Sequence, residues 1–296
     1  MKTYHSLFKL YKDQPLDTAF AHFYPSKRDQ QNPDYDEPFK AIARSTLDGV
    51  DAWAFQQEKF KLKHSSTAVP KLKNYLNYTF GHLLELEQNE PGRYFLFAQD
   101  QEWVCFNTGL QNSFGVDLLA IFQKYKQKAG DTAVRPDWVY KACCALNDRQ
   151  YRDLFGNRTA EIAWFSKDSR DYIFDTSYQL DRGAFDHLFD RAKERAGFPK
   201  GSDEVIRNYL RGAIENLVPK ILRNYKIAIP VYFVEEKRMQ LLLPFVSASD
   251  PNDVSCFVID RDDENKSYHL KTIFDLDHAY FAARLITRPD KEWLNP

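Results

Sequence analysis

Apolar residues recur at helical spacing in two long stretches of this 296-residue chain. The first stretch begins at Pro70, a residue favoured in the first turn of a helix, and stops at Glu90-Pro91-Gly92. The second follows Ser202 and contains Pro219, which we expect to kink or split the helix. The pattern predicts two amphipathic helices, whose apolar faces include Leu72, Tyr75, Leu76, Phe80 and Leu83 in the first and Ile206, Leu210, Ile214, Leu217 and Ile221 in the second.

Runs rich in branched and aromatic residues predict strands elsewhere in the chain. Two of them, RYFLFAQ and EWVCFNT, flank Asp100-Gln101 and predict a hairpin. We expect a helix over about 116–128 to follow this hairpin. After Lys226, four strand-like runs are separated by charged turns and predict an antiparallel meander. An amphipathic helix from Asp277 to Leu285 is expected to follow the meander.

Helices early in the chain, a sheet later and no repeated strand-helix-strand rhythm predict an α+β fold. We expect a helical N-terminal layer over residues 1–65, packed on a mostly antiparallel sheet. Residues 66–296 are expected to form the main α+β domain, with a helix closing the C-terminal β-meander. No stretch has the composition of a linker, so the prediction is a single compact domain, and polar stretches near 127–136 and 197–203 are the alternative boundaries.

Charge and composition narrow the classes of function. The chain has 41 Lys and Arg against 42 Asp and Glu, a net charge of −1, so any affinity for nucleic acid must come from a local patch. Nothing in the sequence points to DNA in particular. No apolar run reaches the length of a membrane span and the first residues do not resemble a signal peptide, which predicts a cytoplasmic protein with no membrane partner.

The cysteines and histidines do not form a recognisable metal or redox motif. Cys105, Cys143, Cys144 and Cys256 lack the spacing of a disulfide framework or a zinc site, so we expect reduced structural cysteines, with a catalytic thiol at Cys105 or Cys256 as the alternative. The seven histidines lie singly, and the sequence contains no phosphate-loop, dinucleotide, zinc-protease or serine-hydrolase motif. Neither a metal nor another cofactor is expected.

The group of residues best suited to an anion lies between the second long helix and the meander. Arg223, Asn224 and Lys226 combine two cations with an amide, which suits a phosphate or a carboxylate. Residues 204–226 hold five basic and two acidic side chains, so the region is locally positive. The alternative is a solvated helix face whose basic residues complement the helix dipole near its C-terminal end.

Other polar residues stand in apolar surroundings. Asn107, Thr108 and Gly109 follow a predicted strand, where a turn either presents donors to a ligand or simply ends the strand. Gln240 in MQLLLPF and Arg284 in AYFAARLI must each find a protein partner or face a ligand.

His278 opens the last predicted helix beside two aspartates. Its position fits a general base, and it equally fits a histidine that caps the helix.

Four blocks of the chain, in this order, resemble the family known as domain of unknown function 3825. They are KLKNYLNYTFGHL, WVCFNTGL, LRGAIENLVPKILRNYKIAIPVYFVEEKRMQLLLPF and KTIFDLDHAYFAARLITRPDKEWL, and together they span about Val69 to Leu294. The resemblance implies that most of the chain is one evolutionary unit. Members resemble one another at FNTGL, at RNYK, at a strand glutamine and at AY…ARLI, which here contain Asn107, Arg223, Gln240 and Arg284.

The same resemblance bears on the class of ligand. Some members are fused to modules associated with RNA, which implies RNA metabolism. This sequence departs from the family pattern at Pro219, where relatives carry a basic helix former, and the departure weakens the basic helix face.

Two hypotheses follow from these observations. In the first, the protein recognises RNA or a nucleotide through its phosphate, with Arg223, Lys226 and Arg284 contacting the anion and Asn107, Asn224 and Gln240 orienting it. Its enzymatic form is a metal-independent phosphoesterase or other nucleotide-processing enzyme in which Tyr225, Tyr280 or His278 transfers a proton. In the second, the basic helix face and aromatic residues bind a protein partner in an interaction or assembly module.

Overall fold

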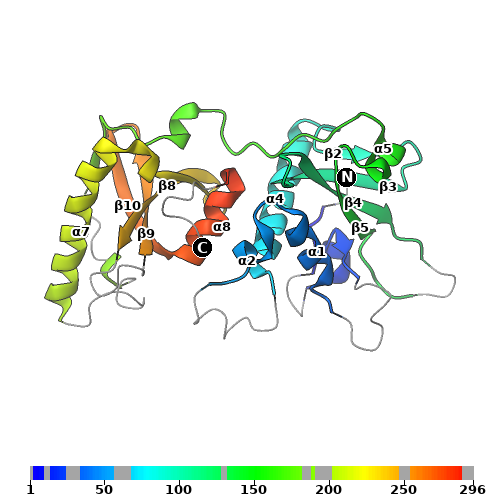
Figure 1. Cartoon of the computed structure of the whole chain (residues 1–296), viewed down its shortest axis with the longest axis horizontal. Coiled ribbons are helices and arrows are strands. Elements are labelled where there is room, and N and C mark those ends of the chain that lie inside the picture. Colours follow the sequence, from blue (N-terminus) through cyan, green and yellow to red (C-terminus); the bar gives the residue numbers. More distant parts are fainter. Residues whose placement is uncertain are drawn as a thin grey trace. The chain divides into compact units, whose positions relative to one another are not determined.

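The computed structural model describes residues 3–9, 14–24, 34–56, 68–127, 132–181, 188–190, 202–246 and 254–288. The chain divides into two compact units, residues 1–163 and residues 164–296, and each contains a five-stranded mixed sheet with its own helices (Figure 1). This architecture confirms the predicted α+β class. The division lies in neither of the polar stretches near 127–136 and 197–203. That the whole chain forms a single compact domain stays a prediction.

The sheet of the N-terminal unit has the strand order β1-β5-β4-β3-β2, with β1 parallel to β5 and the other pairs antiparallel. The predicted hairpin is confirmed as β2 and β3. The helix expected over about 116–128 is wrong, because this segment forms β4. Residues 118–122 are apolar and fully buried, and such a run does not distinguish a central strand from a buried helix by its periodicity. The strands are β1 (Ala21–His22), β2 (Phe95–Phe97), β3 (Trp103–Gln111), β4 (Asp117–Lys124) and β5 (Trp138–Ala145).

Helices accompany this sheet, and the longest confirms the first predicted helix. α4 begins at Pro70 and ends at Asn89, just before Pro91, and buries Leu72, Tyr75 and Phe80. Of the helical layer expected over residues 1–65, α1 and α2 are helical, but Ala21–His22 form β1 of the sheet, and part of the range, including residues 57–65, lies outside the described residues. The helical elements are η1 (Leu16–Thr18), α1 (Glu37–Ser45), α2 (Gly49–Trp53), α4 (Pro70–Asn89) and α5 (Arg149–Phe155).

The sheet of the C-terminal unit has the strand order β6-β10-β9-β8-β7. The last four strands of the chain pair in sequence and antiparallel, which confirms the predicted meander. A short strand that was not predicted, β6, adds to the edge of the meander and runs parallel to β10. The strands are β6 (Gln179–Asp181), β7 (Ile229–Phe233), β8 (Arg238–Val246), β9 (Val254–Asp262) and β10 (Ser267–Asp275).

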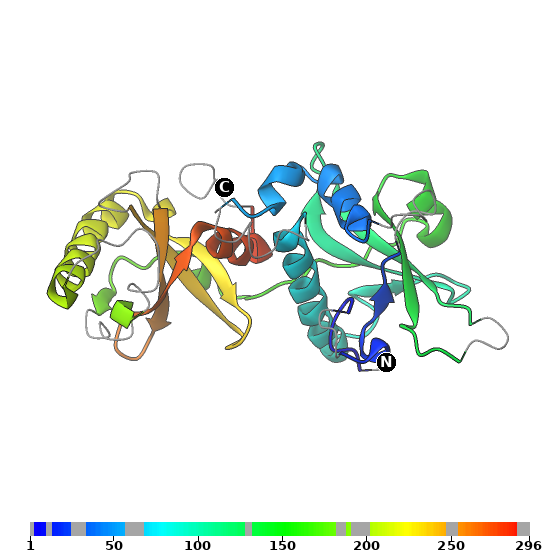
Figure 2. The same ribbon diagram turned by 90° about the horizontal axis from the view of Figure 1, so that it is seen from below.

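Two helices cover opposite faces of this second sheet, α7 (Asp203–Arg223) on one and α8 (Leu276–Ile286) on the other (Figures 1 and 2). The apolar face of α7 packs on alternate residues of β8 and β9. α7 continues through Pro219 to Arg223, so of the two outcomes expected at Pro219 the split does not occur, and the kink stays a prediction. Two short 3-10 helices precede β6 and β7, namely η3 (Ser169–Tyr172) and η4 (Tyr225–Ile227).

None of the helices in the described part of the chain combines the length and apolar character that a membrane span requires.

Candidate functional site

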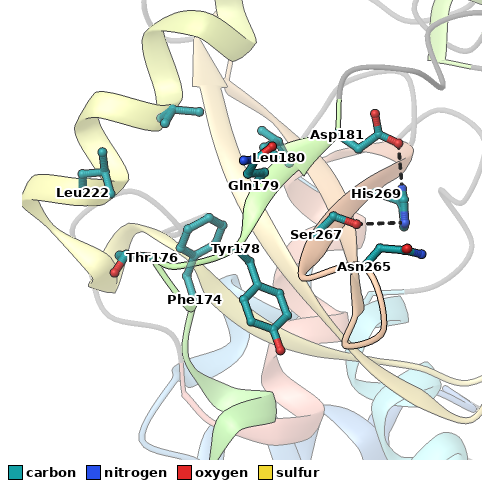
Figure 3. Close-up of a pocket in the computed structure, with 11 residues that line it drawn as sticks. Phe174, Thr176, Tyr178, Gln179, Leu180, Asp181, Leu222, Asn265, Ser267 and His269 are labelled. Atoms are coloured by element: carbon teal, nitrogen blue, oxygen red, sulfur yellow. Dashed lines mark hydrogen bonds and ion pairs between the residues drawn. The ribbon is translucent and has the colours of Figure 1, made fainter.

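A pocket of about 720 Å³ opens beside edge strand β6 of the C-terminal unit (Figure 3). Val218 and Leu222 of α7 form one wall, and Phe174 and Leu180 add further apolar surface. Small-molecule sites typically enclose about 300–1,000 Å³ and combine apolar walls with a few polar groups. This pocket therefore has the size and composition of a small-molecule site. Its remaining lining residues are Thr176, Tyr178, Gln179, Asp181, Asn265, Ser267 and His269.

The polar wall is organised by His269, which lies between two carboxylates. The parallel register of β6 and β10 places Asp181 opposite His269, and its Oδ2 lies 3.0 Å from the imidazole Nδ1. The other ring nitrogen, Nε2, lies 3.0 Å from Oδ2 of Asp262 at the end of β9. His269 thus joins β6, β10 and β9 through one side chain. We call Asp181, His269 and Asp262 the histidine clamp.

The clamp favours the protonated form of its histidine. The hydrogen bond to Asp262 raises the pKa of His269, burial opposes this rise, and Asp181 adds to it. The pKa of Asp262 is lowered, first by the side-chain hydrogen bond from Asn265 and then by the bond from His269. Because each ring nitrogen lies 3.0 Å from a carboxylate oxygen, this geometry favours an imidazolium held by two anions.

This charge state decides what Ser267 can do. Its hydroxyl oxygen lies 3.3 Å from Nε2 of His269, a distance that on its own fits a nucleophile and its base. In a Ser-His-Asp triad, however, this nitrogen must be able to accept the serine proton. Here Nε2 lies closer to the carboxylate of Asp262, at 3.0 Å, than to Ser267, at 3.3 Å, so the geometry favours a role in orienting and binding groups over activation of Ser267.

A second polar cluster explains Gln240. Asp260 is buried on β9, where Nη1 of Arg238 lies 2.6 Å and Nζ of Lys271 lies 3.5 Å from its Oδ2. Burial raises the pKa of Asp260, while the two cations and a hydrogen bond with Gln240 oppose the rise. The buried glutamine of β8 therefore has a protein partner, which was one of the two outcomes expected for it.

The predicted anion-binding residues lie at the C-terminal end of α7, and we call Lys220, Arg223, Tyr225 and Lys226 the cationic junction. Arg223 donates from Nη1 to the carbonyl oxygen of Pro219 at 3.1 Å. Within the described residues, no carboxylate lies within ion-pair distance of the three cations of the junction. Tyr225, which directly precedes Lys226, is 54% exposed. Asn224 has a structural role, since its side-chain oxygen accepts from the backbone N–H of Lys226 at 3.2 Å and caps η4.

Asn107, Thr108 and Gly109 lie in the N-terminal unit and build a bulge inside β3, not a turn at its end. The side chain of Asn107 donates to Asp117 at 3.0 Å and accepts from the backbone N–H of Gly109 at 3.0 Å. The Thr108 hydroxyl donates to the carbonyl oxygen of Leu118 at 2.6 Å. Asn107 and Thr108 are both buried, and these bonds give all three residues a structural role in shaping the strand.

The predicted residues of α8 are also held by the fold. Asp275 caps the helix by accepting from the backbone N–H of His278 at 3.0 Å, and the ring Nδ1 of His278 lies 2.9 Å from the same carboxylate. The cap is therefore Asp275, and His278, in the first turn of α8, pairs with that capping carboxylate. Tyr280 and Arg284 are both buried.

The structure does not bring the predicted residues together into one site. Among the described residues, no hydrogen bond or ion pair joins the cationic junction to Gln240 or to the predicted residues of α8. Asn107, Thr108 and Gly109 belong to the other unit. The catalytic roles of Tyr225, Tyr280 and His278 stay predictions.

Sequence reasoning missed the histidine clamp, although a signal for it exists. Ser267 and His269 alternate along a predicted strand, and Asp262 ends the strand before it, so hairpin pairing places the three side chains on one face. The partner on β6 carries no such signal, because a three-residue edge strand has no periodicity to detect.

The cysteines have the properties of structural thiols. All four are free, and burial raises the pKa of Cys105 to about 12 and that of Cys256 well above its ordinary value. Such thiols are inert, which supports the structural role expected for them. The described residues contain no group of three His, Cys, Asp or Glu side chains placed to hold a metal ion.

Comparison with known proteins places most of the chain in one family. Residues 50–293 match the family described as Domain of unknown function (DUF3825). No curated protein and no solved structure matches the chain.

Proposed function

The chain belongs to the family Domain of unknown function (DUF3825), and on its own geometry we propose that its C-terminal unit recognises the phosphate of RNA or of a nucleotide. The observation that carries the proposal is the cationic junction. Its three cations lie within residues 220–226, the same short segment as an exposed tyrosine, and have no acidic partner among the described residues.

The chemistry of the junction supports a phosphate ligand. Guanidinium and ammonium groups form charge-assisted hydrogen bonds with phosphate oxygens, and an exposed tyrosine ring provides a surface on which a base stacks. The net charge of the whole chain is only −1, so a phosphate ligand is attracted by this local group of cations and not by the field of the whole protein.

Replacing Arg223 and Lys226 together with alanine tests the proposal. We expect the double variant to bind a fluorescently labelled single-stranded RNA at least about tenfold more weakly, because charge-assisted hydrogen bonds contribute about 1.5–3 kcal/mol each. The slope of log affinity against log salt should fall by about 0.7 for each RNA phosphate that the variant no longer neutralises. Fluorescence anisotropy at several salt concentrations measures both quantities.

A matched control removes the same charge elsewhere. Arg149 and Arg152 are exposed on α5 of the N-terminal unit, and their double alanine variant should bind RNA as the original protein does. Equal affinities for the original protein and the Arg223→Ala/Lys226→Ala variant, with the fold intact by circular dichroism, would contradict the proposal.

The enzymatic form of this hypothesis can be assayed directly. Tyr225 is the one residue with a predicted catalytic role that lies in the cationic junction. Cleavage of the labelled RNA by the original protein, abolished in Tyr225→Phe while binding is retained, is the result that a metal-independent phosphoesterase would give.

A protein partner is the second candidate function, and a specific observation favours it. Leu222 at the end of α7 and Tyr225 in η4 are 57% and 54% exposed, and a contiguous apolar patch formed by them would mark an interaction surface. A mononucleotide should displace bound RNA from a phosphate site, but it should leave a broad protein interface occupied.

A further inference from the structure

The pocket beside β6 is separate from the cations of the junction, and its chemistry differs from theirs. We propose that it binds a nucleoside, with the base between the apolar walls and the ribose hydroxyls at the polar rim. This inference deepens the proposed function, because it assigns to the pocket the part of the ligand that carries no phosphate.

The apolar walls suit a flat heteroaromatic ring. Leu222 is 57% exposed and Val218 lies one turn before it on α7, so this wall presents apolar surface that the core of the unit does not use. Phe174 adds an aromatic surface and is fixed by stacking on Tyr268, with ring centroids 4.5 Å apart and planes at 19°. Walls held in this way need little reordering when a ligand binds.

The polar rim suits hydroxyl and amide groups. The carboxylate of Asp181 accepts hydrogen bonds, in the way that a carboxylate accepts from the ribose hydroxyls of a nucleotide. The amides of Gln179 and Asn265 both accept and donate, as the edge of a base requires. All three residues line the pocket and are labelled in Figure 3, where Asp181 and Asn265 lie near His269 and Gln179 lies beside Leu180.

The electrostatics exclude the phosphate from the pocket itself. His269, the one cation among the described residues that line it, is already paired with Asp181 and Asp262, so the histidine clamp carries more negative than positive charge. A phosphate placed there would meet uncompensated carboxylates, whereas a neutral nucleoside would not.

The position of the pocket links it to the proposed phosphate site. Leu222 lines the pocket and is followed directly in α7 by Arg223 of the cationic junction. The wall of the pocket and the cationic junction therefore share the C-terminal turn of α7, within the same unit.

Filling the pocket tests the inference. We expect adenosine, guanosine, cytidine or uridine to bind the original protein in isothermal titration calorimetry. Val218→Trp should weaken that binding at least about tenfold, because the indole occupies the space against the α7 wall. The matched control is Val205→Trp, the same substitution on the same helix at a residue that is 47% exposed and does not line the pocket. This control should bind the nucleoside normally.

The two proposals fail in different ways. Nucleosides carry no phosphate, so Arg223→Ala/Lys226→Ala should bind them normally while its affinity for RNA falls. If RNA binds the original protein and none of the four nucleosides does, or if Val218→Trp binds nucleosides as well as Val205→Trp does, the pocket assignment is overturned and the junction stands. If a nucleoside binds and the corresponding nucleotide binds no more tightly, the assignment of the pocket to a nucleoside is supported and the phosphate proposal is overturned.

Discussion

Gly109 shows how a single residue fixes the bulge in β3. Its φ is 72°, and a Cβ added there would lie 2.8 Å from the hydroxyl oxygen of Tyr75, which donates a hydrogen bond to the carbonyl oxygen of Thr108 at 2.8 Å. A side chain at this position therefore meets both backbone strain and a clash. The FNTGL motif is thus accounted for by packing.

Gly109→Ala should destabilise the protein by more than the strain alone. The left-handed conformation costs an L-residue about 1–2 kcal/mol, and the clash with Tyr75 adds to this cost. Gly115→Ala is the matched control, because Gly115 has the same φ of 72° and open space around its Cβ position. Urea unfolding should show the larger decrease in stability for Gly109→Ala, and Tyr75→Phe should recover part of it. Equal decreases at the two glycines would contradict this account.

At the scale of elements, the histidine clamp ties a short edge strand to its sheet. β6 has three residues, and its backbone pairing with β10 is reinforced by the ion pair between Asp181 and His269. An edge strand this short depends on side-chain links for its position. We therefore expect the position of β6, and with it the polar rim of the pocket, to depend on the protonation of His269.

The clamp predicts a pH window for stability. The pKa of His269 is raised above its ordinary 6.5, so its contribution is complete below about that pH and is lost as the pH rises through the raised value. The pKa of Asp262 is lowered from 3.8, so its contribution is complete above that pH and is lost as the pH falls through the lowered value. His269→Gln should therefore lower the thermal midpoint most between about pH 4 and 6.5.

A second histidine supplies the control for sign. Burial, followed by the charge of Arg135, lowers the pKa of His22, so its protonation costs stability as the pH falls. The decrease in thermal midpoint caused by His269→Gln should become smaller as the pH rises above neutrality. Any decrease caused by His22→Gln should become smaller as the pH falls. If His269→Gln lowers the thermal midpoint by the same amount at every pH from 5 to 9, the histidine clamp does not stabilise the protein through ion pairs.

The elements also show what the sequence can and cannot predict. α4 and the meander were predicted because each has an extended pattern with clear ends, Pro70 and Pro91 for the helix and charged turns for the strands. β4 was mistaken for a helix because both of its faces are buried, which removes the alternation. The clamp was missed because Asp181 is brought to His269 by pairing between distant segments, and local periodicity contains no information about such pairing.

At the scale of the whole molecule, the chain has two units that each have a sheet and a core. The division at residues 163 and 164 carries no Gly-rich or Pro-rich linker, so composition could not reveal it. The candidate site, by contrast, is contained in one unit. Of the residues that the structure describes, those that line the pocket and those of the cationic junction all lie between 164 and 296.

This organisation predicts that residues 164–296 fold when produced alone. Far-UV circular dichroism should show helix and strand content, and heating should produce one cooperative transition, because the fragment retains its own sheet and apolar core. The fragment 1–163 should behave in the same way. If neither fragment melts cooperatively, the single domain predicted from the sequence would be the better description.

The parallel pairing of β6 with β10 has a consequence for the protein as it is synthesised. The ribosome releases residues 179–181 long before residues 267–269. The segment of β6 therefore cannot pair with β10, its only neighbour in the described sheet, until those later residues have been translated. At about 5–20 residues per second, this wait lasts for seconds. The pocket is therefore completed by the last strand of the nascent meander, and a ligand that binds there can select only chains whose translation has passed β10.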